Sequence, residues 1–296
     1  DDHLLISSVF STKTETTSIL MRYDKENEWL TLLDNDKNVK TTLMTKERRL
    51  ENKLNSFAKV SLSTDLSHLT DNQNEMLNIL FKVADIMDEL FWIEAYGDKN
   101  ELLNTTDDSV LHALFDINYG PWERLNNDKP LTGTFGSKPK GANFYPVDMT
   151  EEEFELFDDP AKSSLYTLIR RDDAGNLKTV WYHEAFREKI DKAAAMLVEA
   201  SELAEDAGFK TYLKKRAKAL LSDKYSESDA AWMMMKDNDI DFVVGPIENY
   251  EDKLFNYKAA HEAFILIKDP EWSKKLERLT QFRRIHLVFG PYVERL

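Results

Sequence analysis

One long amphipathic pattern, from residue 70 to residue 97, constrains the fold of this chain more than any other feature. Thr70-Asp-Asn-Gln73 fits a capping box, in which a hydroxyl and a side-chain amide satisfy free backbone N–H groups at a helix start. The apolar residues that follow recur at helical spacing: Met76, Ile79, Leu80, Val83, Met87, Leu90 and Phe91. Gly97 is a typical residue after a helix end. The pattern predicts a long helix that buries one face.

The rest of the hydrophobic pattern predicts an α+β fold that is predominantly α-helical, with a small antiparallel sheet. Only 9 Gly and 8 Pro occur in 296 residues, which favours regular elements. Further helices are expected at residues 46–57, 184–207, 209–221, 228–236, 254–267 and 272–282. Strands are expected near residues 4–10, 17–21, 28–33, 164–170, 177–182 and 240–244. Gly208 is expected to break one helix pair, and Asp172-Asp-Ala-Gly175 predicts a hairpin turn with a bulge.

The acidic composition excludes several classes of function. The formal net charge is -15, and such a surface repels nucleic acid unless a basic patch overcomes the repulsion. The basic clusters are short and are interpreted as solvated helix faces. The chain has no cysteine, which excludes disulfides, thiolate catalysis and cysteine-bound zinc. No apolar run is long enough to span a bilayer, so a soluble, acidic protein is expected.

Two His-Glu pairs invite comparison with zinc peptidase motifs. Such a site needs His-Glu-x-x-His on a helix, so that both imidazoles face the metal and the glutamate activates water. His183-Glu184 and His261-Glu262 begin in the required way. The positions four and five residues after each histidine hold Arg187, Glu188, Ile265 and Leu266. Neither pair is therefore a zinc motif, and both histidines are interpreted as helix-surface or partly buried residues. A metal site assembled from distant residues stays open.

The most distinctive segment is Ile240-Asp-Phe-Val-Val-Gly-Pro-Ile-Glu-Asn-Tyr-Glu-Asp252. An apolar strand runs into a Gly-Pro pair and then presents Glu248, Asn249 and Tyr250. Glu248 and Tyr250 lie on the same side if the backbone stays extended. A carboxylate can hold an ammonium group, and a phenol can donate to a carbonyl oxygen on which negative charge develops. The alternative is that Glu248 caps the next helix or pairs with Lys253.

The same segment resembles the dipeptidyl peptidase III family of zinc metallopeptidases. The resemblance also includes Phe255-Asn-Tyr-Lys-Ala-Ala-His-Glu-Ala-Phe264 and Asp65-Leu-Ser-His-Leu69. A bacterial branch is indicated by Asn118-Tyr-Gly-Pro-Trp-Glu-Arg-Leu125, Gly141-Ala-Asn-Phe-Tyr-Pro-Val-Asp-Met-Thr-Glu-Glu-Glu-Phe154 and Ser164-Leu-Tyr-Thr-Leu-Ile-Arg-Arg171. The likeness covers about residues 52 to 282, and it is most specific at residues 240–264.

The resemblance implies a fold and a set of roles. Family members have two lobes around a cleft, and the lower lobe combines helices with a small antiparallel sheet or barrel. By resemblance, Glu248 accepts the peptide's free α-amino group, Asn249 and Tyr250 also bind the substrate, and Tyr250 steadies the tetrahedral intermediate as a possible oxyanion stabiliser. The expected domains are a poorly readable segment of short strands at 1–50, a dipeptidyl peptidase III-like lower lobe at 51–282, and an unrelated tail at 283–296.

The family's zinc ligands have no counterpart in this sequence, so no cofactor is expected in this chain although zinc is expected in the full-length family. A peptide is the expected partner, and a homo-oligomer is a further expectation.

The chain is interpreted as a truncated product, a lobe expressed on its own, or the product of an interrupted gene. Its function is then the substrate-binding portion of a metallopeptidase, a hydrolase class, without hydrolysis of its own. A non-catalytic peptide- or protein-binding module is the alternative. A bacterial periplasm or cell envelope and the cytoplasm both stay open as compartments.

Overall fold

The structure is a computed structural model that describes residues 3–11, 16–24, 29–33, 39–44, 46–276 and 278, with side chains from residue 48 onward. The chain forms two compact units, and each is described by itself. The first unit comprises Asp1–Leu62 and Asn100–Ser137, and the second comprises Ser63–Lys99 and Lys138–Leu296. The tail predicted at 283–296 lies outside the described residues. The domain boundaries expected from the resemblance stay a prediction.

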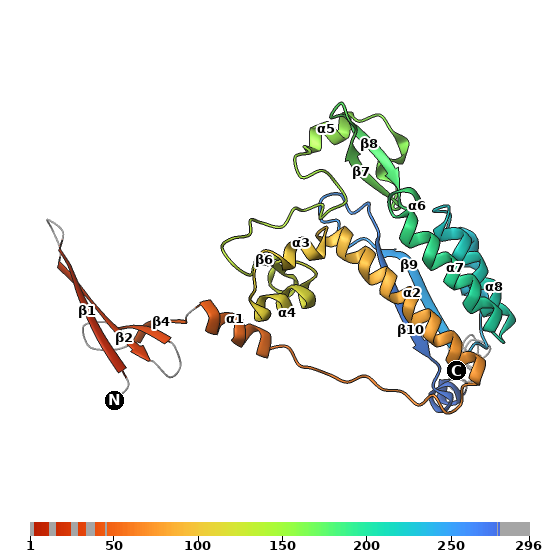
Figure 1. The fold of residues 1–296 in the computed structure, drawn as a ribbon, viewed down its shortest axis with the longest axis horizontal. Coiled ribbons are helices and arrows are strands. Elements are labelled where there is room, and N and C mark those ends of the chain that lie inside the picture. Colours follow the sequence, from red (N-terminus) through yellow and green to blue (C-terminus); the bar gives the residue numbers. More distant parts are fainter. Residues whose placement is uncertain are drawn as a thin grey trace, which may run out of the picture. The chain divides into compact units, whose positions relative to one another are not determined.

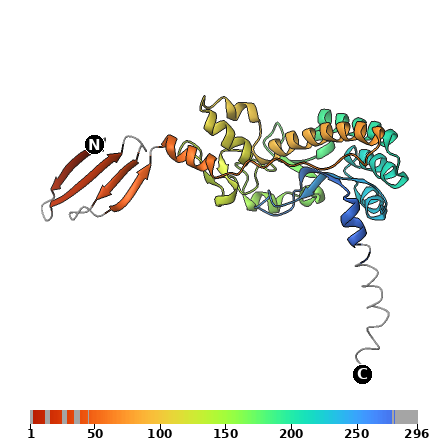
Figure 2. The ribbon, with the colours of Figure 1, turned by 90° about the horizontal axis from the view of Figure 1, so that it is seen from below.

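The first unit combines an antiparallel sheet with short helices. Its strands β1 (His3–Ser11), β2 (Thr16–Asp24), β3 (Trp29–Leu33) and β4 (Val39–Met44) pair in sequence order, and Figure 2 shows them as neighbouring arrows. The other elements are α1 (Lys46–Asn55), α3 (Lys99–Leu103) at the border of the unit, α4 (Ser109–Asn118), β5 (Trp122–Glu123), η1 (Arg124–Asn126) and β6 (Lys129–Pro130). The first three strands and α1 confirm predictions, and β4 was not predicted.

The second unit is built around α2 (Asp71–Ala95), the helix predicted from the amphipathic pattern. The capping box is confirmed, because the Thr70 hydroxyl accepts from the Gln73 N–H and the Gln73 side chain accepts from the Thr70 N–H. The buried face of α2 packs against α7 (Arg187–Leu203) and against β10 (Ala260–Ile267). Figure 1 shows these elements side by side with β9 (Ile240–Glu248) and α8 (Ala207–Leu220). One hydrophobic core joins all of them.

The helix predicted at 254–267 is wrong, because this region holds a strand. β10 pairs antiparallel with β9, and Ile267 lies opposite Ile240 at the far end. Its Ala, Glu and Leu residues favour helix in isolation, but the apolar strand β9 offers a continuous row of backbone partners. Tertiary pairing therefore overrides local propensity here.

A bulge interrupts the β9–β10 ladder close to the turn. Ala260 lies opposite Glu248 and His261 lies opposite Pro246, so Ile247 is an extra residue on β9. Ala260 and His261, which are neighbours on β10, are both buried. The bulge lies on the partner strand and changes the alternation of side chains along β9, between Pro246 and Glu248.

The break in the α7–α8 pair differs from the prediction. α7 ends at Leu203, and α8 begins at Ala207, so Gly208 lies inside the first turn of α8 and does not separate the helices. Asp206 caps α8 by accepting a hydrogen bond from the Phe209 N–H at 2.6 Å. Acidic N-caps are common because they satisfy the free N–H groups of the first turn.

Among the remaining elements of the second unit, two strands and one helix were predicted: β7 (Thr167–Arg171), β8 (Leu177–Trp181) and α9 (Ser226–Met234). The others are α5 (Glu151–Leu156), η2 (Pro160–Ser163) and α6 (Tyr182–Ala185). The hairpin turn is confirmed: Gly175 has a φ of 85°, the left-handed conformation that a bulge glycine supplies. Residues 270–276 are helical, and most of the remainder of the predicted 272–282 helix lies outside the described residues.

The fold class is therefore α+β, mostly helical with small antiparallel sheets, as predicted from sequence. No helix within the described part of the chain is long and apolar enough to cross a membrane.

Candidate functional site

Glu248, Asn249 and Tyr250 form an exposed tip where β9 ends, here called the recognition tip (248–250). Tyr250 is 73% exposed, and Glu248 is also exposed. The backbone is extended only as far as Glu248 and then turns. The prediction that an extended chain places Glu248 and Tyr250 on the same side therefore does not apply. The three residues are close because they share one turn.

The Glu248 carboxylate has no hydrogen bond or ion pair among the residues that the structure describes. It caps no helix, because the next regular element is the strand β10. The amide of Asn249, in contrast, donates to the carbonyl oxygen of Asn256 at 2.6 Å and closes the turn. Glu248 and Tyr250 are thus left available to a ligand, while Asn249 is part of the local structure.

The segment after the tip, here called the supporting loop (251–259), is organised by Asp252. This side chain is fully buried and accepts five hydrogen bonds. The donors are the backbone N–H groups of Leu254, Phe255, Tyr257 and Lys258, at 2.9–3.1 Å, and the hydroxyl of Tyr145, at 2.7 Å. One carboxylate therefore satisfies four of the backbone donors of a loop that has no regular structure.

Two further contacts tie the supporting loop to residues 138–145. Glu251 forms a buried ion pair with Lys138, and the backbone N–H of Lys253 donates to the carbonyl oxygen of Lys140 at 2.8 Å. Burial is the main cause that raises the pKa of Tyr145, and the Asp252 charge adds to it, so its hydroxyl keeps its proton as a donor. The loop is thus held against its neighbour by charge and by backbone hydrogen bonds.

Lys258 closes the supporting loop with a buried ammonium group. Its side chain is 0% exposed, and its Nζ donates to three acceptors. These are the carbonyl oxygens of Lys162 and Ser164 and the hydroxyl of Thr167, at 2.6, 3.0 and 2.8 Å. Burial lowers the pKa of Lys258 to about 7, against the opposing influence of the Asp252 and Asp159 charges. All three donors of the ammonium are used, which is what a buried charge requires.

An aromatic cluster lies next to the supporting loop. Phe154 stacks on Phe255 with ring centroids 4.4 Å apart, and Tyr145 meets both rings edge-on. Tyr257 stacks on Phe255 at 5.7 Å. Because these contacts fix the loop from its apolar side while Asp252 fixes its backbone, the recognition tip projects from a well-packed base.

The two His-Glu pairs occupy different environments, and neither lies on a zinc-binding helix. His183 lies on the short helix α6 and is half-buried; its Nδ1 is 2.7 Å from Asp223 Oδ2. His261 lies on β10 and is fully buried, which corrects the helix-surface or partly buried interpretation. Its Nδ1 is 2.6 Å from Glu94 Oε1, and its backbone N–H donates to Glu94 Oε2 at 2.8 Å. Within the described ranges, no three His, Cys, Asp or Glu side chains are grouped so as to hold a metal ion.

Sequence reasoning missed Asp252, Lys258 and Glu94. A signal for Glu94 was present, because it continues the apolar stripe of α2 at the spacing Val83, Met87, Leu90, Glu94. A charged residue on a buried helix face indicates a buried partner, which is His261. Asp252 and Lys258 lie in irregular structure, where hydrophobic periodicity gives no information on burial.

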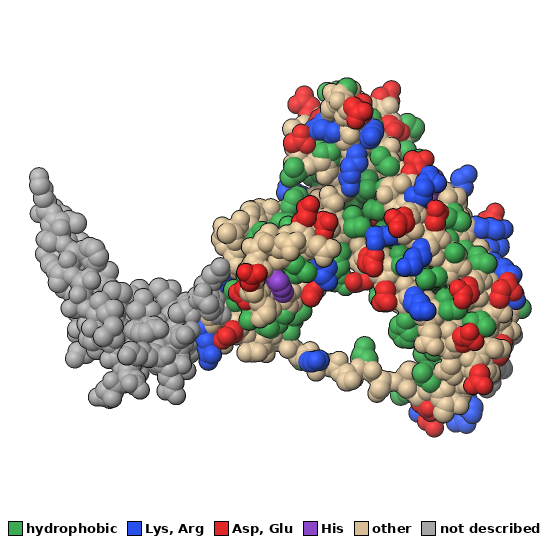
Figure 3. Space-filling model, viewed as in Figure 1, with side chains coloured by type: hydrophobic (Ala, Val, Ile, Leu, Met, Phe, Trp, Pro, Cys, Tyr) green, Lys and Arg blue, Asp and Glu red, His purple; other side chains and the backbone are tan. Residues whose placement is uncertain are grey.

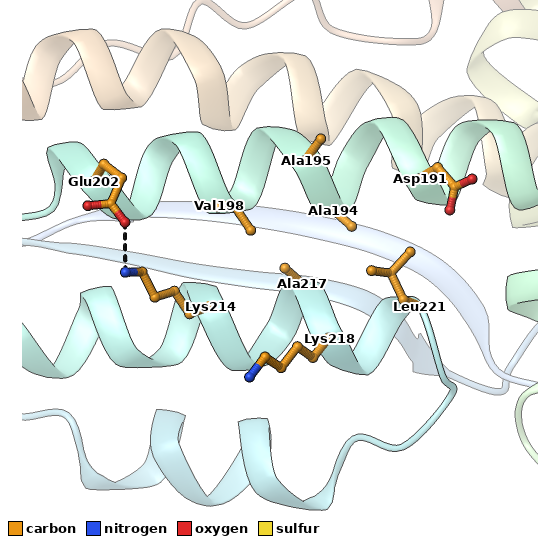
Figure 4. Close-up of a pocket in the computed structure, with 9 residues that line it drawn as sticks. All are labelled: Asp191, Ala194, Ala195, Val198, Glu202, Lys214, Ala217, Lys218 and Leu221. Carbon is orange, nitrogen blue, oxygen red and sulfur yellow. Dashed lines mark ion pairs between the residues drawn. The ribbon is translucent and has the colours of Figure 1, made fainter.

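A separate groove lies between α7 and α8 (Figure 4), with a volume of about 520 Å³. Ala194 and Ala217 line it, and Glu202 and Lys214 form an ion pair across one end at 2.7 Å. The groove contains none of the recognition-tip residues. On the face of the second unit seen in Figure 3, acidic and basic side chains are interspersed, with no concentrated basic patch.

Comparison with known proteins relates the chain to solved structures of similar fold. No family model matches the chain. It is similar to the structure of a dipeptidyl peptidase III from Caldithrix abyssi, with 42% identity and a TM-score of 0.74, over 78% of this chain and 46% of that one. A dipeptidyl-peptidase III from Corallococcus sp. strain EGB matches with 33% identity and a TM-score of 0.73, over 79% of this chain and 46% of that one.

A curated relative, Nudix hydrolase 3 of Arabidopsis thaliana, is 29% identical over 290 residues, which cover 77% of this chain and 37% of the plant protein. The chain thus spans less than half the length of each of these three proteins. The fold is peptidase-related. More narrowly, the chain is dipeptidyl peptidase III-like and corresponds to part of the bacterial enzymes of that name.

Proposed function

We propose that the chain supplies the part of a dipeptidyl peptidase III-type zinc peptidase that binds the amino end of a peptide. The observation that carries the proposal is the recognition tip, where an exposed carboxylate and an exposed phenol stand two residues apart on a firmly packed loop. The Glu248 carboxylate accepts charge-assisted hydrogen bonds from the free α-ammonium group of the peptide. The Tyr250 hydroxyl donates to a carbonyl oxygen of the bound peptide. The Asn249 backbone links these two groups.

The contribution of Tyr250 depends on the charge of the oxygen that it contacts. A neutral phenol hydrogen-bonds weakly to a neutral carbonyl and more strongly to an oxygen that gains negative charge during attack on the peptide bond. In a complete peptidase this difference would favour the tetrahedral intermediate. Zinc would supply the activated water in the complete family member, whereas the residues of this chain bind and orient the peptide.

A binding experiment tests the role of Glu248. A tetrapeptide with a free amino end is expected to bind, and its N-acetylated form is expected to bind at least about tenfold less, because the charged donor is removed. Calorimetric titration of both peptides measures the ratio. Glu248→Gln is expected to abolish the preference, and Glu199→Gln, at an exposed glutamate on α7, serves as the matched control. Equal binding of both peptides to the unmodified chain would remove the proposed role.

A second experiment separates a binding part from an enzyme. We expect no stoichiometric zinc and no release of dipeptides from arylamide substrates, because the sequence has no His-Glu-x-x-His motif. Metal analysis and a fluorescent arylamide assay measure both quantities. Chelator-sensitive hydrolysis would show that this chain holds a metal site of its own.

A further inference from the structure

The strand β10 forms one edge of the β9–β10 sheet. Within the part of the chain that the structure describes, this sheet has two strands, so each strand has one side without a neighbouring strand (Figure 1). On β9 that side is covered by α8, because the Tyr212 hydroxyl donates to the carbonyl oxygen of Phe242 at 2.6 Å. An uncovered edge strand offers backbone donors and acceptors to another strand. β10 is therefore the side of the sheet that is open to a further strand.

The hydrogen bonds at the two ends of β10 show which of its backbone groups point away from β9. The Lys268 N–H donates to the Asp239 carbonyl oxygen at 2.8 Å, towards β9, whereas the His261 N–H donates to Glu94 on α2. Backbone groups alternate between the two sides of an antiparallel strand, so those of the odd-numbered residues point outward. Beyond His261 these residues are Ala263, Ile265 and Ile267. Among the described residues, nothing outside the ladder forms a hydrogen bond with their backbone groups.

The side chains of β10 divide between the two faces of the sheet. Those of Ala263, Ile265 and Ile267 pack against the hydrophobic core. Phe264 and Leu266 lie on the other face and are 50% and 52% exposed. Residues 263–267 include no charge and no proline, the two features with which exposed edges commonly avoid pairing. β10 thus combines an open edge with exposed apolar side chains.

We propose that β10 pairs antiparallel with β10 of a second copy of this chain, about a two-fold axis at Ile265. Ile265 then lies opposite the same residue of the partner, and Ala263 lies opposite the partner's Ile267. In this register every outward N–H and C=O group of the three residues gains a partner, because the hydrogen-bonded positions of the new ladder fall on these residues. The edge is therefore complementary to itself.

The ends of the edge oppose other registers. A shift by two residues in one direction would need the His261 N–H, which already donates to Glu94 at 2.8 Å. A shift in the other direction would need the carbonyl oxygen of Asp269, which already accepts from the Ser273 N–H at 2.9 Å. A shift by one residue would place outward groups opposite groups that belong to the β9 ladder. The register centred on Ile265 thus uses the open backbone groups without breaking an existing hydrogen bond.

The exposed face is complementary in the same register. Phe264 lies opposite the partner's Leu266, so the exposed apolar side chains of the two copies cover one another. Glu262 lies opposite the partner's Lys268, and the two-fold axis repeats both pairs. Opposite charges across a ladder stabilise the pairing. Although two chains of net charge -15 repel each other in general, these local pairs favour a second copy as the partner of the edge.

The resulting dimer is closed. Its sheet has the order β9–β10–β10–β9, and α8 covers the outer side of β9 in each copy. Because a two-fold pairing uses the open edge of both copies, no third copy adds to the sheet. The inference goes beyond the proposed function, since neither Glu248 nor Tyr250 lies on this edge.

Sedimentation equilibrium of the full chain tests the pairing, and a concentration-dependent dimer is expected. Phe264→Lys should raise the dimer dissociation constant at least about tenfold, because it places a charge opposite the partner's Leu266. Val198→Lys is the matched control, since Val198 on α7 is similarly exposed, at 46%, and should leave the constant unchanged. A monomer at every concentration overturns the proposal and leaves the edge to another occupant, such as an extended peptide. A dimer that Phe264→Lys does not weaken overturns it as well.

Exchange of the charges at residues 262 and 268 tests the register. Glu262→Lys and Lys268→Glu each place like charges opposite one another in the dimer, so each should raise the dissociation constant several-fold. The double exchange should restore it. Within one chain the two residues are about 20 Å apart along the strand, so they cannot pair with each other. Restoration is therefore a property of the dimer, and a double variant that is weaker than either single variant contradicts the register.

Cysteine cross-linking provides a readout that does not depend on charge, because the chain has no cysteine of its own. Phe264→Cys and Leu266→Cys are prepared as separate proteins. Directly opposite residues at non-hydrogen-bonded positions have Cα atoms about 4.5 Å apart, within reach of a disulfide, whereas diagonal neighbours lie at about 7–8 Å. After mixing and oxidation the two variants should form a mixed cross-linked dimer, and each alone should form much less. Equal cross-linking of either variant with itself contradicts the proposed pairing.

Discussion

The recognition tip and the supporting loop are adjacent in the chain but opposite in environment. Glu248 and Tyr250 are exposed and free of hydrogen bonds within the described part of the chain, whereas Asp252 and Lys258 are buried and fully hydrogen-bonded. The tip contributes little to the stability of the fold and is available for contact with a ligand. The loop contributes stability and keeps the tip in place. The groups proposed to bind a peptide and the groups that hold the loop are thus neighbouring but different residues.

The sharpest test of this division is Asp252→Ala. Removing the carboxylate leaves four buried or half-buried backbone N–H groups and the Tyr145 hydroxyl without their acceptor, so the free energy of unfolding should fall by about 3–5 kcal/mol. Denaturant titration measures the loss. Asp172→Ala is the control, because Asp172 also accepts backbone N–H groups but in exposed hydrogen bonds, so a much smaller loss is expected there. Equal losses would show that burial of the supporting loop does not matter.

The Glu94–His261 pair extends the comparison to the base of the hairpin. Glu94→Gln keeps the shape of the side chain but replaces an acceptor of two hydrogen bonds by a group with one acceptor oxygen. The free energy of unfolding is expected to fall by about 1–3 kcal/mol, measured by denaturant titration. Glu89→Gln, on the exposed side of α2, is expected to cost less than about 0.5 kcal/mol. An unchanged free energy of unfolding for Glu94→Gln would mean that the buried pair does not stabilise β10.

Lys258 gives the stability of the supporting loop a dependence on pH. The pKa of Lys258 in the folded protein is about 7, below the ordinary 10.5, so the unfolded chain binds more protons between these two values. The protein should therefore gain stability relative to Lys258→Met as pH rises from 7 to 10.5, by at most about 1.4 kcal/mol per pH unit. Unfolding curves of both proteins across this range measure the difference. A difference independent of pH contradicts the lowered pKa.

The smallest effect is expected at the tip itself. Glu248→Gln and Tyr250→Phe alter exposed groups that have no partner in the described structure, so each should change the free energy of unfolding by less than about 0.5 kcal/mol. Thermal and denaturant unfolding measure this directly. A loss above 1 kcal/mol for either variant would show that the tip is part of the supporting structure.

The long helix, the 172–175 hairpin turn and the fold class were predictable because each depends on local patterns: the period of α2, its capping box and a glycine in a turn. The strand β10 was not, since its residues favour helix and only the pairing with β9 makes it a strand. The same limit applies to the site. The recognition tip was recognisable as a motif, whereas Asp252 and Lys258 act through backbone groups that sequence patterns do not reveal.

The extra residue at Ile247 has a consequence for comparing and engineering this hairpin. Side chains in a strand alternate between faces, so deleting Ile247 would leave Glu248 opposite Ala260 in a regular ladder but would change the face on which Glu248 lies relative to Pro246. An alignment gap at this position would therefore signal a change in what the tip presents, even where every other residue is kept. A graft of the hairpin onto another scaffold must include Ile247 for Glu248 and His261 to keep their opposite environments.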